Sequence, residues 1–192
     1  MPRLFTGIPL SAELRQRLAE AEKELAQVSA NTSWVGAEKL HITMRFLGEV
    51  SEVLVPQIEE AINLTTQTHQ SFPLEVCGLG AFPNSKRARV LWAGLSTGKT
   101  EALTLFTTLE KELEKVGFAR ETRPFSGHIT LGRVRYPKHN VELERKLAES
   151  ADIIFGGEPA ERLVLFKSTL KPRGSIYDEL YSAKLSLGAQ SS

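Results

Sequence analysis

The chain has 192 residues and a formal net charge of +1. This length suits one domain or two small lobes, and the near-neutral charge excludes a broad, charge-driven nucleic-acid binder but leaves room for a local basic patch. No apolar run reaches the roughly 18 residues that a membrane span needs, and Met1-Pro2 opens no signal-type leader. The single Cys77 cannot form an internal disulfide, so we expect a cytoplasmic protein.

The predicted elements alternate between strands and helices along the chain. Apolar patterning predicts strands at residues 3–8, 39–47, 72–76, 88–95, 127–134, 160–169 and 176–187. It predicts helices beginning at Ser11 and Ser51, a third striped by Leu103, Phe106, Leu109, Leu113 and Val116 up to Gly117, and a fourth over 141–149. Residues 31–33 read as loop, with Trp34 wedged between two lobes. Residues 171–174 read as a hairpin loop, and 188–192 as a frayed tail.

Two copies of one tripeptide stand out in this order. His41-Ile42-Thr43 recurs as His128-Ile129-Thr130, at an offset of 128 − 41 = 87 residues. Leu4-Phe5-Thr6-Gly7-Ile8 and Leu91-Trp92-Ala93-Gly94-Leu95 share the same offset, 91 − 4 = 87. The chain therefore reads as a duplicated unit with pseudo-two-fold symmetry, with repeat halves of about 1–87 and 88–187.

The predicted fold class is α+β. We expect a single bilobal domain over residues 1–192, with two antiparallel-type sheets facing a central cleft and helices on the outer faces. Residues two apart in a strand point to the same side. Each His therefore shares a face with its Thr, and the two faces are expected to meet across the cleft.

This pair of motifs resembles the 2H phosphoesterase superfamily, and within it the RNA 2′,3′-cyclic phosphodiesterases, also called the 2′–5′ RNA ligase family. The resemblance covers nearly the whole chain. It includes the opening Arg3-Leu4-Phe5, Trp34, residues 40–49, 80–83, 90–94 and 128–133, the stretch 168–174 and Tyr177. Gly127 departs from the Pro that many relatives carry before the second His, which removes no reacting group.

The residues of the motifs suit proton transfer at a phosphate. Imidazole has an unperturbed pKa of ~6.5, so two facing imidazoles can serve as acid and base. Thr43 and Thr130 can each donate an O–H to a phosphate oxygen. The resemblance implies that His41 is the acid that protonates the leaving O3′ and that His128 is the base that activates water.

Two further residues are candidates for substrate binding. Arg133 resembles a family phosphate contact, and Phe46 occupies the equivalent position of the first repeat, since 133 − 46 = 87. They could close on opposite faces of the terminal base by stacking and cation–π contact. In a regular strand, a residue five positions after a His points to the opposite face. A bend is therefore required to bring Phe46 and Arg133 to the face of the histidines. Gly132 could permit one beside Arg133, nothing similar is evident beside Phe46, and a core position for Phe46 remains open.

Other local patterns favour surface roles. His69, His139 and Cys77 lack metal-ligand spacing, so no metal is expected. Residues 96–100 are similar to a P-loop, but Ala93 replaces its first Gly, so ATP binding is not expected there. Strand alternation places Arg45 on the His41 face, where it could contact RNA, but an ordinary surface position is favoured. The cluster Lys86-Arg87-Ala88-Arg89 could also steer RNA, although most such clusters are simply solvated.

These observations predict a cofactor-free, monomeric enzyme that opens 2′,3′-cyclic phosphate ends of RNA, or small cyclic nucleotides, to 2′-phosphates. The alternatives are the same site run in reverse as a 2′–5′ RNA ligase, and a non-catalytic module that binds nucleotides or RNA ends. Catalysis is predicted to rest on His41, His128, Thr43 and Thr130, and substrate binding on Arg133 and Phe46.

Overall fold

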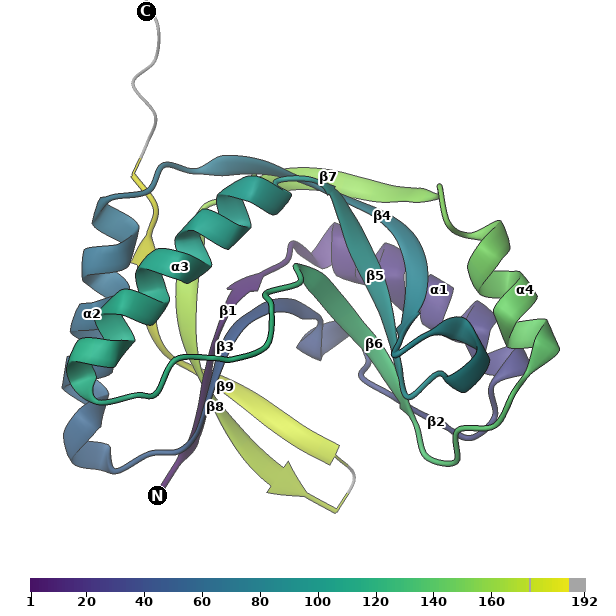
Figure 1. Ribbon diagram of the computed structural model, residues 1–192, viewed down its shortest axis with the longest axis horizontal. Helices are drawn as coiled ribbons and strands as arrows, with labels where there is room; N and C mark the ends of the chain where they lie inside the picture. Colours follow the sequence, from purple (N-terminus) through teal and green to yellow (C-terminus); the bar gives the residue numbers. More distant parts are fainter. Residues whose placement is uncertain (173, 187–192) are drawn as a thin grey trace, which may run out of the picture.

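The computed structural model describes residues 1–172 and 174–186 (Figure 1). Arg173, in the predicted hairpin loop, and the predicted tail at 188–192 lie outside the described residues. Within the described part of the chain, none of the helices combines the length and apolarity that a bilayer crossing requires.

Strands and helices alternate as the sequence predicts, and the α+β class is confirmed. The elements run in the order β1 (Arg3–Pro9), α1 (Ala12–Val28), β2 (Thr32–Trp34), β3 (His41–Glu49), α2 (Val55–Gln67), β4 (Phe72–Phe82), β5 (Val90–Thr97), α3 (Lys99–Val116), β6 (His128–Val134), α4 (Val141–Glu149), β7 (Ile154–Ala160), β8 (Arg162–Lys171) and β9 (Gly174–Lys184). Short 3₁₀ turns occupy Ala37–Lys39, Glu52–Leu54 and Ser85–Arg87.

Two strands differ from the sequence prediction. β2 replaces the predicted loop at 31–33; it is only three residues long, too short for a periodic pattern, and its Trp34 pairs with Gly132 of β6. β7 contains two glycines and a proline, which disfavour a strand by propensity. It lies at the end of the strand order, where a proline costs no ladder hydrogen bond on its open side.

The helices follow their sequence signals with two corrections. Ser11 caps α1 by accepting a hydrogen bond from the Leu14 N–H at 3.2 Å, as predicted. The second helix begins at Val55 rather than Ser51, because a 3₁₀ turn precedes it, and this leaves Pro56 in the first turn, where no hydrogen bond is lost. In α3 the predicted stripe member Leu103 is 47% exposed, and Ala102 and Leu105 are buried in its place.

The predicted repeat is visible in the elements themselves. The starts of β1 and β5 differ by 90 − 3 = 87 residues, those of α1 and α3 by 99 − 12 = 87, and those of β3 and β6 by 128 − 41 = 87. Equivalent strands also have equivalent neighbours, because β1 pairs with β3 and β8 while β5 pairs with β6 and β4.

The strands form one sheet in the order β7-β4-β5-β6-β3-β1-β8-β9, with β2 added beside β6. The two expected sheets are the two halves of this order. They join at β3 and β6, where the register contains a single pair, Ile42 with Ile129. Helices α1 and α4 contact the β4–β7 side, and α2 contacts β8 and β9 with α3 packed on it. Figure 1 shows the two lobes splaying away from the joint.

Each lobe takes elements from both halves of the chain. β4 comes from the first half but pairs with β5 and β7, whereas β8 and β9 come from the second half and extend the sheet from β1. Helix α1 leaves β1 and contacts β6 and β7 of the other lobe. The repeat units are therefore interlocked rather than placed side by side.

Candidate active site

The two His-x-Thr motifs meet where the lobes join. Ile42 and Ile129, the middle residues of the motifs, are paired and 0% exposed. The strands are antiparallel, so this pair sets His41 beside Thr130 and Thr43 beside His128. All four side chains lie on the face opposite the buried isoleucines, because neighbours along a strand alternate between faces. The predicted constellation is thus assembled around the pseudo-two-fold axis.

Backbone carbonyls orient both imidazoles. Nδ1 of His41 lies 2.6 Å from the Lys39 carbonyl oxygen, and Nδ1 of His128 lies 2.6 Å from that of Ser126. A carbonyl only accepts, so each Nδ1 carries the proton and donates it, which leaves each Nε2 for chemistry. Nε2 of His41 lies 2.9 Å from Oγ1 of Thr43.

Aromatic rings surround His41. Phe5 stacks on its imidazole at a centroid distance of 4.8 Å, Tyr177 presents an edge at 5.5 Å, and Phe166 lies at 5.7 Å. Gly7 lies under the ring, and a Cβ there would come within 2.9 Å of the Ile42 carbonyl and 3.2 Å of His41 Cδ2. The absence of a side chain at Gly7 therefore lets the imidazole lie over β1.

His128 has a sparser aromatic environment. Phe82 meets its imidazole edge-on at 5.0 Å and lies 5.2 Å from Trp92. Gly94, the repeat equivalent of Gly7, pairs with His128 in the sheet. Each histidine therefore has a nearby glycine and an aromatic ring against it, although only His128 is paired with its glycine, since His41 pairs with Pro9.

Both imidazoles are shifted toward the neutral form. Burial lowers the pKa of His41, against an opposing hydrogen bond to the Lys39 carbonyl, and the nearby His128 lowers this pKa further. Burial also lowers the pKa of His128, opposed by the Ser126 carbonyl and assisted by the positive charge of Arg133. The effect of His128 on the pKa of His41 is consistent with the closeness of the two rings across the joint.

Matching irregularities in β3 and β6 resolve the problem of strand parity. In β3, Gly7 pairs with Thr43 and Thr6 with Arg45, so Met44 is skipped. In β6, Trp92 pairs with Thr130 and Leu91 with Gly132, so Leu131 is skipped. One skipped residue reverses the alternation beyond it. Phe46 and Arg133 thereby return to the histidine face, and the expectation that β3 has no bend beside Phe46 is wrong.

Phe46 is not a core residue. Its side chain is 51% exposed, and its ring lies 5.8 Å from that of Phe5. Phe46 and Arg133 line one pocket of about 380 Å³ together with Arg3, Tyr177 and the serines Ser168 and Ser175. The structure thus brings both predicted substrate-binding residues to a single hollow beside His41.

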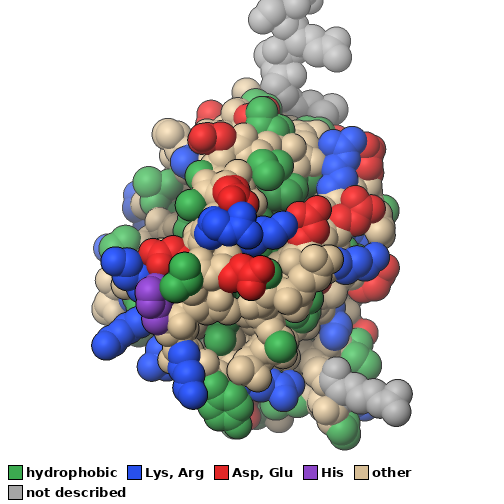
Figure 2. Space-filling view, turned by 90° about the vertical axis from the view of Figure 1, so that its right-hand side faces the viewer, with side chains coloured by type: hydrophobic (Ala, Val, Ile, Leu, Met, Phe, Trp, Pro, Cys, Tyr) green, Lys and Arg blue, Asp and Glu red, His purple; other side chains and the backbone are tan. Residues whose placement is uncertain are grey.

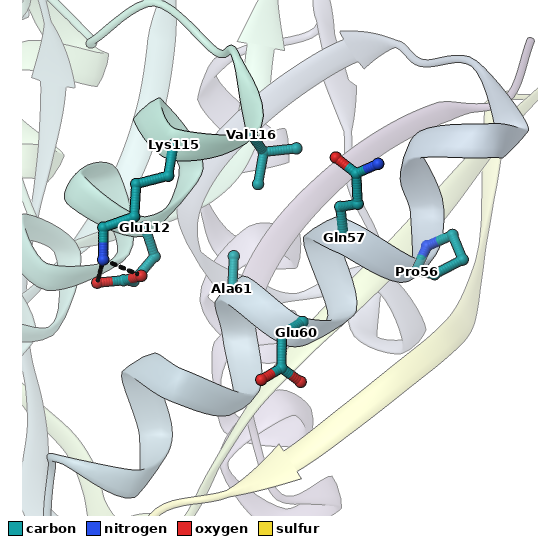
Figure 3. Close-up of a pocket in the computed structure, with 7 residues that line it drawn as sticks. All are labelled: Pro56, Gln57, Glu60, Ala61, Glu112, Lys115 and Val116. Carbon is teal, nitrogen blue, oxygen red and sulfur yellow. Dashed lines mark hydrogen bonds and ion pairs between the residues drawn. The ribbon is translucent and has the colours of Figure 1, made fainter.

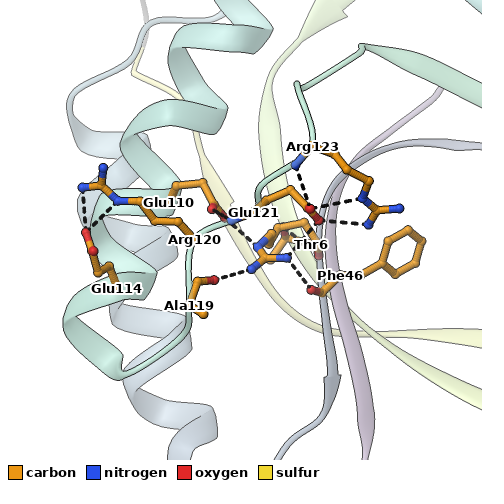
Figure 4. Close-up of polar contacts among 9 residues, drawn as sticks. Thr6, Phe46, Glu110, Glu114, Ala119, Arg120, Glu121 and Arg123 are labelled. Carbon is orange, nitrogen blue, oxygen red and sulfur yellow. Dashed lines mark hydrogen bonds and ion pairs between the residues drawn. The ribbon is translucent and has the colours of Figure 1, made fainter.

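Arg45 serves the fold instead of the cleft. Its Nε lies 2.6 Å from Glu110 of α3 and its Nη1 lies 3.3 Å from Glu121, while its Nη2 donates to the Ala119 carbonyl at 2.6 Å. Figure 4 shows this network, in which Glu121 also holds Arg123 at 3.0 Å. Arg45 is thereby committed to α3 and the segment after it, because the skipped Met44 turns its side chain away from the histidines.

A second pocket, between α2 and α3, does not suit a phosphate (Figure 3). It measures about 360 Å³ and has no histidine in its lining. Its one cation, Lys115, is bound to Glu112 at 2.7 Å, and Glu60 adds a second carboxylate. This acidic lining repels an anion.

The remaining histidines lie outside the site. Nδ1 of His69 is 2.9 Å from the Thr65 carbonyl, and Nε2 of His139 is 2.8 Å from Glu144. Among residues 1–172 and 174–186, no three His, Cys, Asp or Glu side chains gather in a way that could hold a metal ion.

Sequence reasoning named Phe5, Phe82 and Tyr177 within the repeat or the family resemblance but assigned none of them a place beside the histidines. For Phe5 a signal was available, because it alternates with buried Leu4 and Thr6 and shares the face of Gly7. Phe82 and Tyr177 reach the site because β5 pairs with β6 and β8 pairs with β1, and no local pattern predicts these pairings.

The chain is similar to known phosphoesterases over most of its length. A family model described as LigT like phosphoesterase matches residues 8–92 and 95–177. A relative from Archaeoglobus fulgidus named RNA 2′,3′-cyclic phosphodiesterase is 36% identical, covering 93% of this chain and 97% of its own. One of the same name from Aeropyrum pernix is 34% identical, covering 88% of this chain and 94% of its own.

Solved structures share the architecture. TT0787 of Thermus thermophilus superposes with a TM-score of 0.81 at 28% identity, over 95% of this chain and 97% of that one. Escherichia coli LigT complexed with 3′-AMP superposes with a TM-score of 0.78, over 96% of this chain and 98% of that one. At 24% identity the second likeness shows the fold alone.

Proposed function

Because the chain belongs to the LigT-like phosphoesterase family, we propose that it hydrolyses 2′,3′-cyclic phosphate ends of RNA to 2′-phosphates. The observation that carries this proposal is the pair of symmetry-related imidazoles, each donating Nδ1–H to a carbonyl and presenting Nε2 on one face. Such a pair suits an in-line displacement, in which a base and an acid act on opposite sides of phosphorus.

In the proposed mechanism, neutral His128 accepts a proton from water through Nε2 as the water oxygen attacks phosphorus. The P–O3′ bond breaks, and protonated His41 gives its Nε2 proton to the departing O3′. The hydroxyls of Thr43 and Thr130 donate to the non-bridging oxygens and stabilise the charge that develops there. The lowered pKa of His128 supports its role as a base that is neutral near pH 7.

Phe46 and Arg133 are proposed to seat the terminal nucleotide. The exposed ring of Phe46 offers a stacking surface that tolerates any base. Arg133 can contact the phosphate or the opposite face of the base, because both residues line the pocket beside His41. A metal or cofactor is not required, since every group in this mechanism belongs to the chain. We also propose that the protein acts as a monomer, and that it acts in the cytoplasm, where its single free Cys77 stays reduced.

The decisive test is to incubate an RNA that ends in a 2′,3′-cyclic phosphate with the protein and excess chelator, and to identify the product. A 2′-phosphate that forms at an undiminished rate is expected. Loss of activity on chelation, with recovery on adding a divalent ion, would contradict the metal-independent mechanism. The same assay with excess RNA bearing a free 5′-hydroxyl end would reveal a 2′–5′ ligated product if the reverse reaction prevails.

Variants then test the histidines. His41→Ala and His128→Ala should each reduce turnover by the ~10²–10⁴-fold typical of a lost acid or base. A substrate whose 3′ oxygen is replaced by a better leaving group needs no protonation there. It should rescue His41→Ala and not His128→Ala, and the opposite pattern would reverse the two roles. Nucleotide binding without hydrolysis by the wild type would support the non-catalytic module instead.

A further inference from the structure

Acidic residues are absent from two long stretches of this otherwise balanced chain. Residues 76–100 and 122–141 contain no Asp or Glu. The structure joins these stretches, because β5 pairs with β6 and the Val134 N–H donates to the Arg89 carbonyl at 2.9 Å. Cations concentrate where the pairing ends, and we call them the basic end: Lys86, Arg87, Arg89, Arg133, Arg135 and Lys138.

The side chains of the basic end are available to a ligand. All six are exposed. Within residues 1–172 and 174–186 none of them forms an ion pair, whereas arginines elsewhere, such as Arg17, Arg120 and Arg162, are paired. Figure 2 views the molecule from the side of α4, and the lower part of that face carries Lys and Arg with few acidic side chains.

The basic end is continuous with the candidate active site. Arg133 lines the pocket beside Phe46, and its charge acts on His128. Arg135 follows two residues later, so the cations lead from the site toward the end of β6. β6 ends at Val134, so Arg135 and Tyr136 lie in the bend that directly follows the strand.

A groove lies at the far end of this path. It measures about 450 Å³ and is lined by polar and aromatic side chains, among them Asn31, Tyr136, Lys138 and His139. Tyr136 is 69% exposed, so its ring is available to stack on a ligand. An exposed ring beside lysines and arginines is the arrangement with which proteins bind single-stranded nucleic acid, by stacking bases and neutralising phosphates.

Carboxylates at the edge of the groove restrict how a bound nucleic-acid strand can run. Glu142 also lines the groove, and Glu144 is engaged by His139 and by Ser85 at 3.4 Å. Phosphates are therefore favoured on the side of Arg135 and Lys138, with a base toward Tyr136.

We propose that the basic end and Tyr136 bind the RNA strand 5′ of the terminal nucleotide, with Tyr136 stacking an upstream base. This inference rests on the proposed function and extends it, because it makes an RNA strand, rather than a cyclic mononucleotide, the preferred substrate. A strand held at its end by Phe46 and Arg133 continues over the cations to the groove.

The experiment compares a 2′,3′-cyclic mononucleotide with an oligonucleotide that ends in the same cyclic nucleotide. The wild type should give a higher kcat/KM with the oligonucleotide, and this advantage should shrink as salt rises. Arg135→Ala/Lys138→Ala and Lys86→Ala/Arg87→Ala should each reduce the oligonucleotide-to-mononucleotide ratio by about 10-fold at low salt. A plot of the logarithm of kcat/KM for the oligonucleotide against the logarithm of the salt concentration should become less steep by ~0.7 for each lost phosphate contact.

The matched control is Lys23→Ala/Lys111→Ala, which removes two exposed cations from α1 and α3. It should leave the ratio unchanged. Tyr136→Ala should reduce the ratio, and Tyr136→Phe should preserve it, because stacking needs the ring and not the hydroxyl.

Several outcomes would overturn the proposal. They are an unchanged ratio in the basic-end variants, an equal reduction in the control pair, and equal losses with both substrates. A wild type that hydrolyses neither substrate would refute the proposed function alone. The surface is then tested by fluorescence anisotropy with a labelled single-stranded RNA, for which the basic-end variants must bind more weakly than the control pair.

Discussion

At the scale of single residues, the proposed site contains two imidazoles whose pKa values are lowered by burial. In the proposed mechanism the active form needs one protonated and one neutral ring, and kcat/KM reports the free enzyme. The pH profile should therefore be bell-shaped, with its maximum below ~6.5, the ordinary value for histidine. Initial rates at low substrate from pH 4.5 to 8.5 check this, and a maximum above pH 7 would contradict it.

Arg133 offers a control on the same profile. Its positive charge contributes to lowering the pKa of His128, so Arg133→Ala should raise that pKa. The acidic limb of the profile, where the proposed base loses its proton, should then move to higher pH. Arg133→Lys retains the charge and should keep the limb in place. A limb that stays fixed in the alanine variant would mean that Arg133 does not influence the base.

Phe46 is expected to act on binding and not on folding, because half of its side chain is exposed. Base–aromatic stacking contributes ~1–3 kcal/mol per base. Phe46→Ala should therefore raise KM about 5- to 150-fold for cyclic mononucleotides of all four bases, whereas Phe46→Tyr should keep the wild-type KM. Steady-state kinetics and thermal unfolding check this together. A lowered Tm with unchanged KM would return Phe46 to a structural role.

At the scale of elements, α1 holds the segment that leads into the first motif. Glu22 of α1 is buried and accepts the Gly36 N–H at 3.2 Å, and Gly36 precedes the turn whose Lys39 carbonyl orients His41. Burial raises the pKa of Glu22 to about 7, although the hydrogen bond from Gly36 opposes the shift. The carboxyl group is thus neutral in the folded protein below neutral pH.

This shift predicts a pH dependence of stability. The folded pKa of about 7 exceeds the unfolded value of 4.5, so the stabilising contribution is complete below pH 4.5 and is lost as pH rises through 7. Glu22→Gln remains neutral throughout. At pH 8 the free energy of unfolding of this variant should exceed that of the wild type by about 1–2 kcal/mol, after allowance for solvent screening. At pH 4.5 the two free energies of unfolding should coincide.

Denaturant titrations at several pH values measure this difference. Glu20→Gln, at an exposed position of the same helix for which no ion pair is described, serves as the control and should show no such trend. Equal stabilities of Glu22→Gln and wild type at pH 8 would rule out the raised pKa.

At the scale of the whole molecule, the two repeats are interlocked. β4 of the first half completes the sheet of β5 and β7, and β8 of the second half completes the sheet of β1. Fragments cut at residue 87 would each expose an unpaired sheet edge and the apolar face of a helix. Residues 1–87 and 88–192 should therefore be unfolded alone and regain structure when mixed. Circular dichroism checks this, and a cooperative unfolding transition in either isolated fragment would contradict it.

The sequence by itself determined the repeat and the α+β class and singled out the four motif residues, because periodic patterning and a duplicated tripeptide are local signals. It also named Phe46 and Arg133, but strand parity argued against both. Only tertiary structure decided that question, since skipped residues at Met44 and Leu131 arise from pairing with neighbouring strands.

Tertiary structure alone also decided the surroundings of the site. Phe82 and Tyr177 reach the histidines through strands distant in sequence. The basic end forms because β5 and β6 pair side by side. Arg45, which strand alternation placed on the histidine face, is drawn to Glu110 of α3 instead. Each of these outcomes depends on contacts between distant segments, and no local pattern of residues encodes which segments will meet.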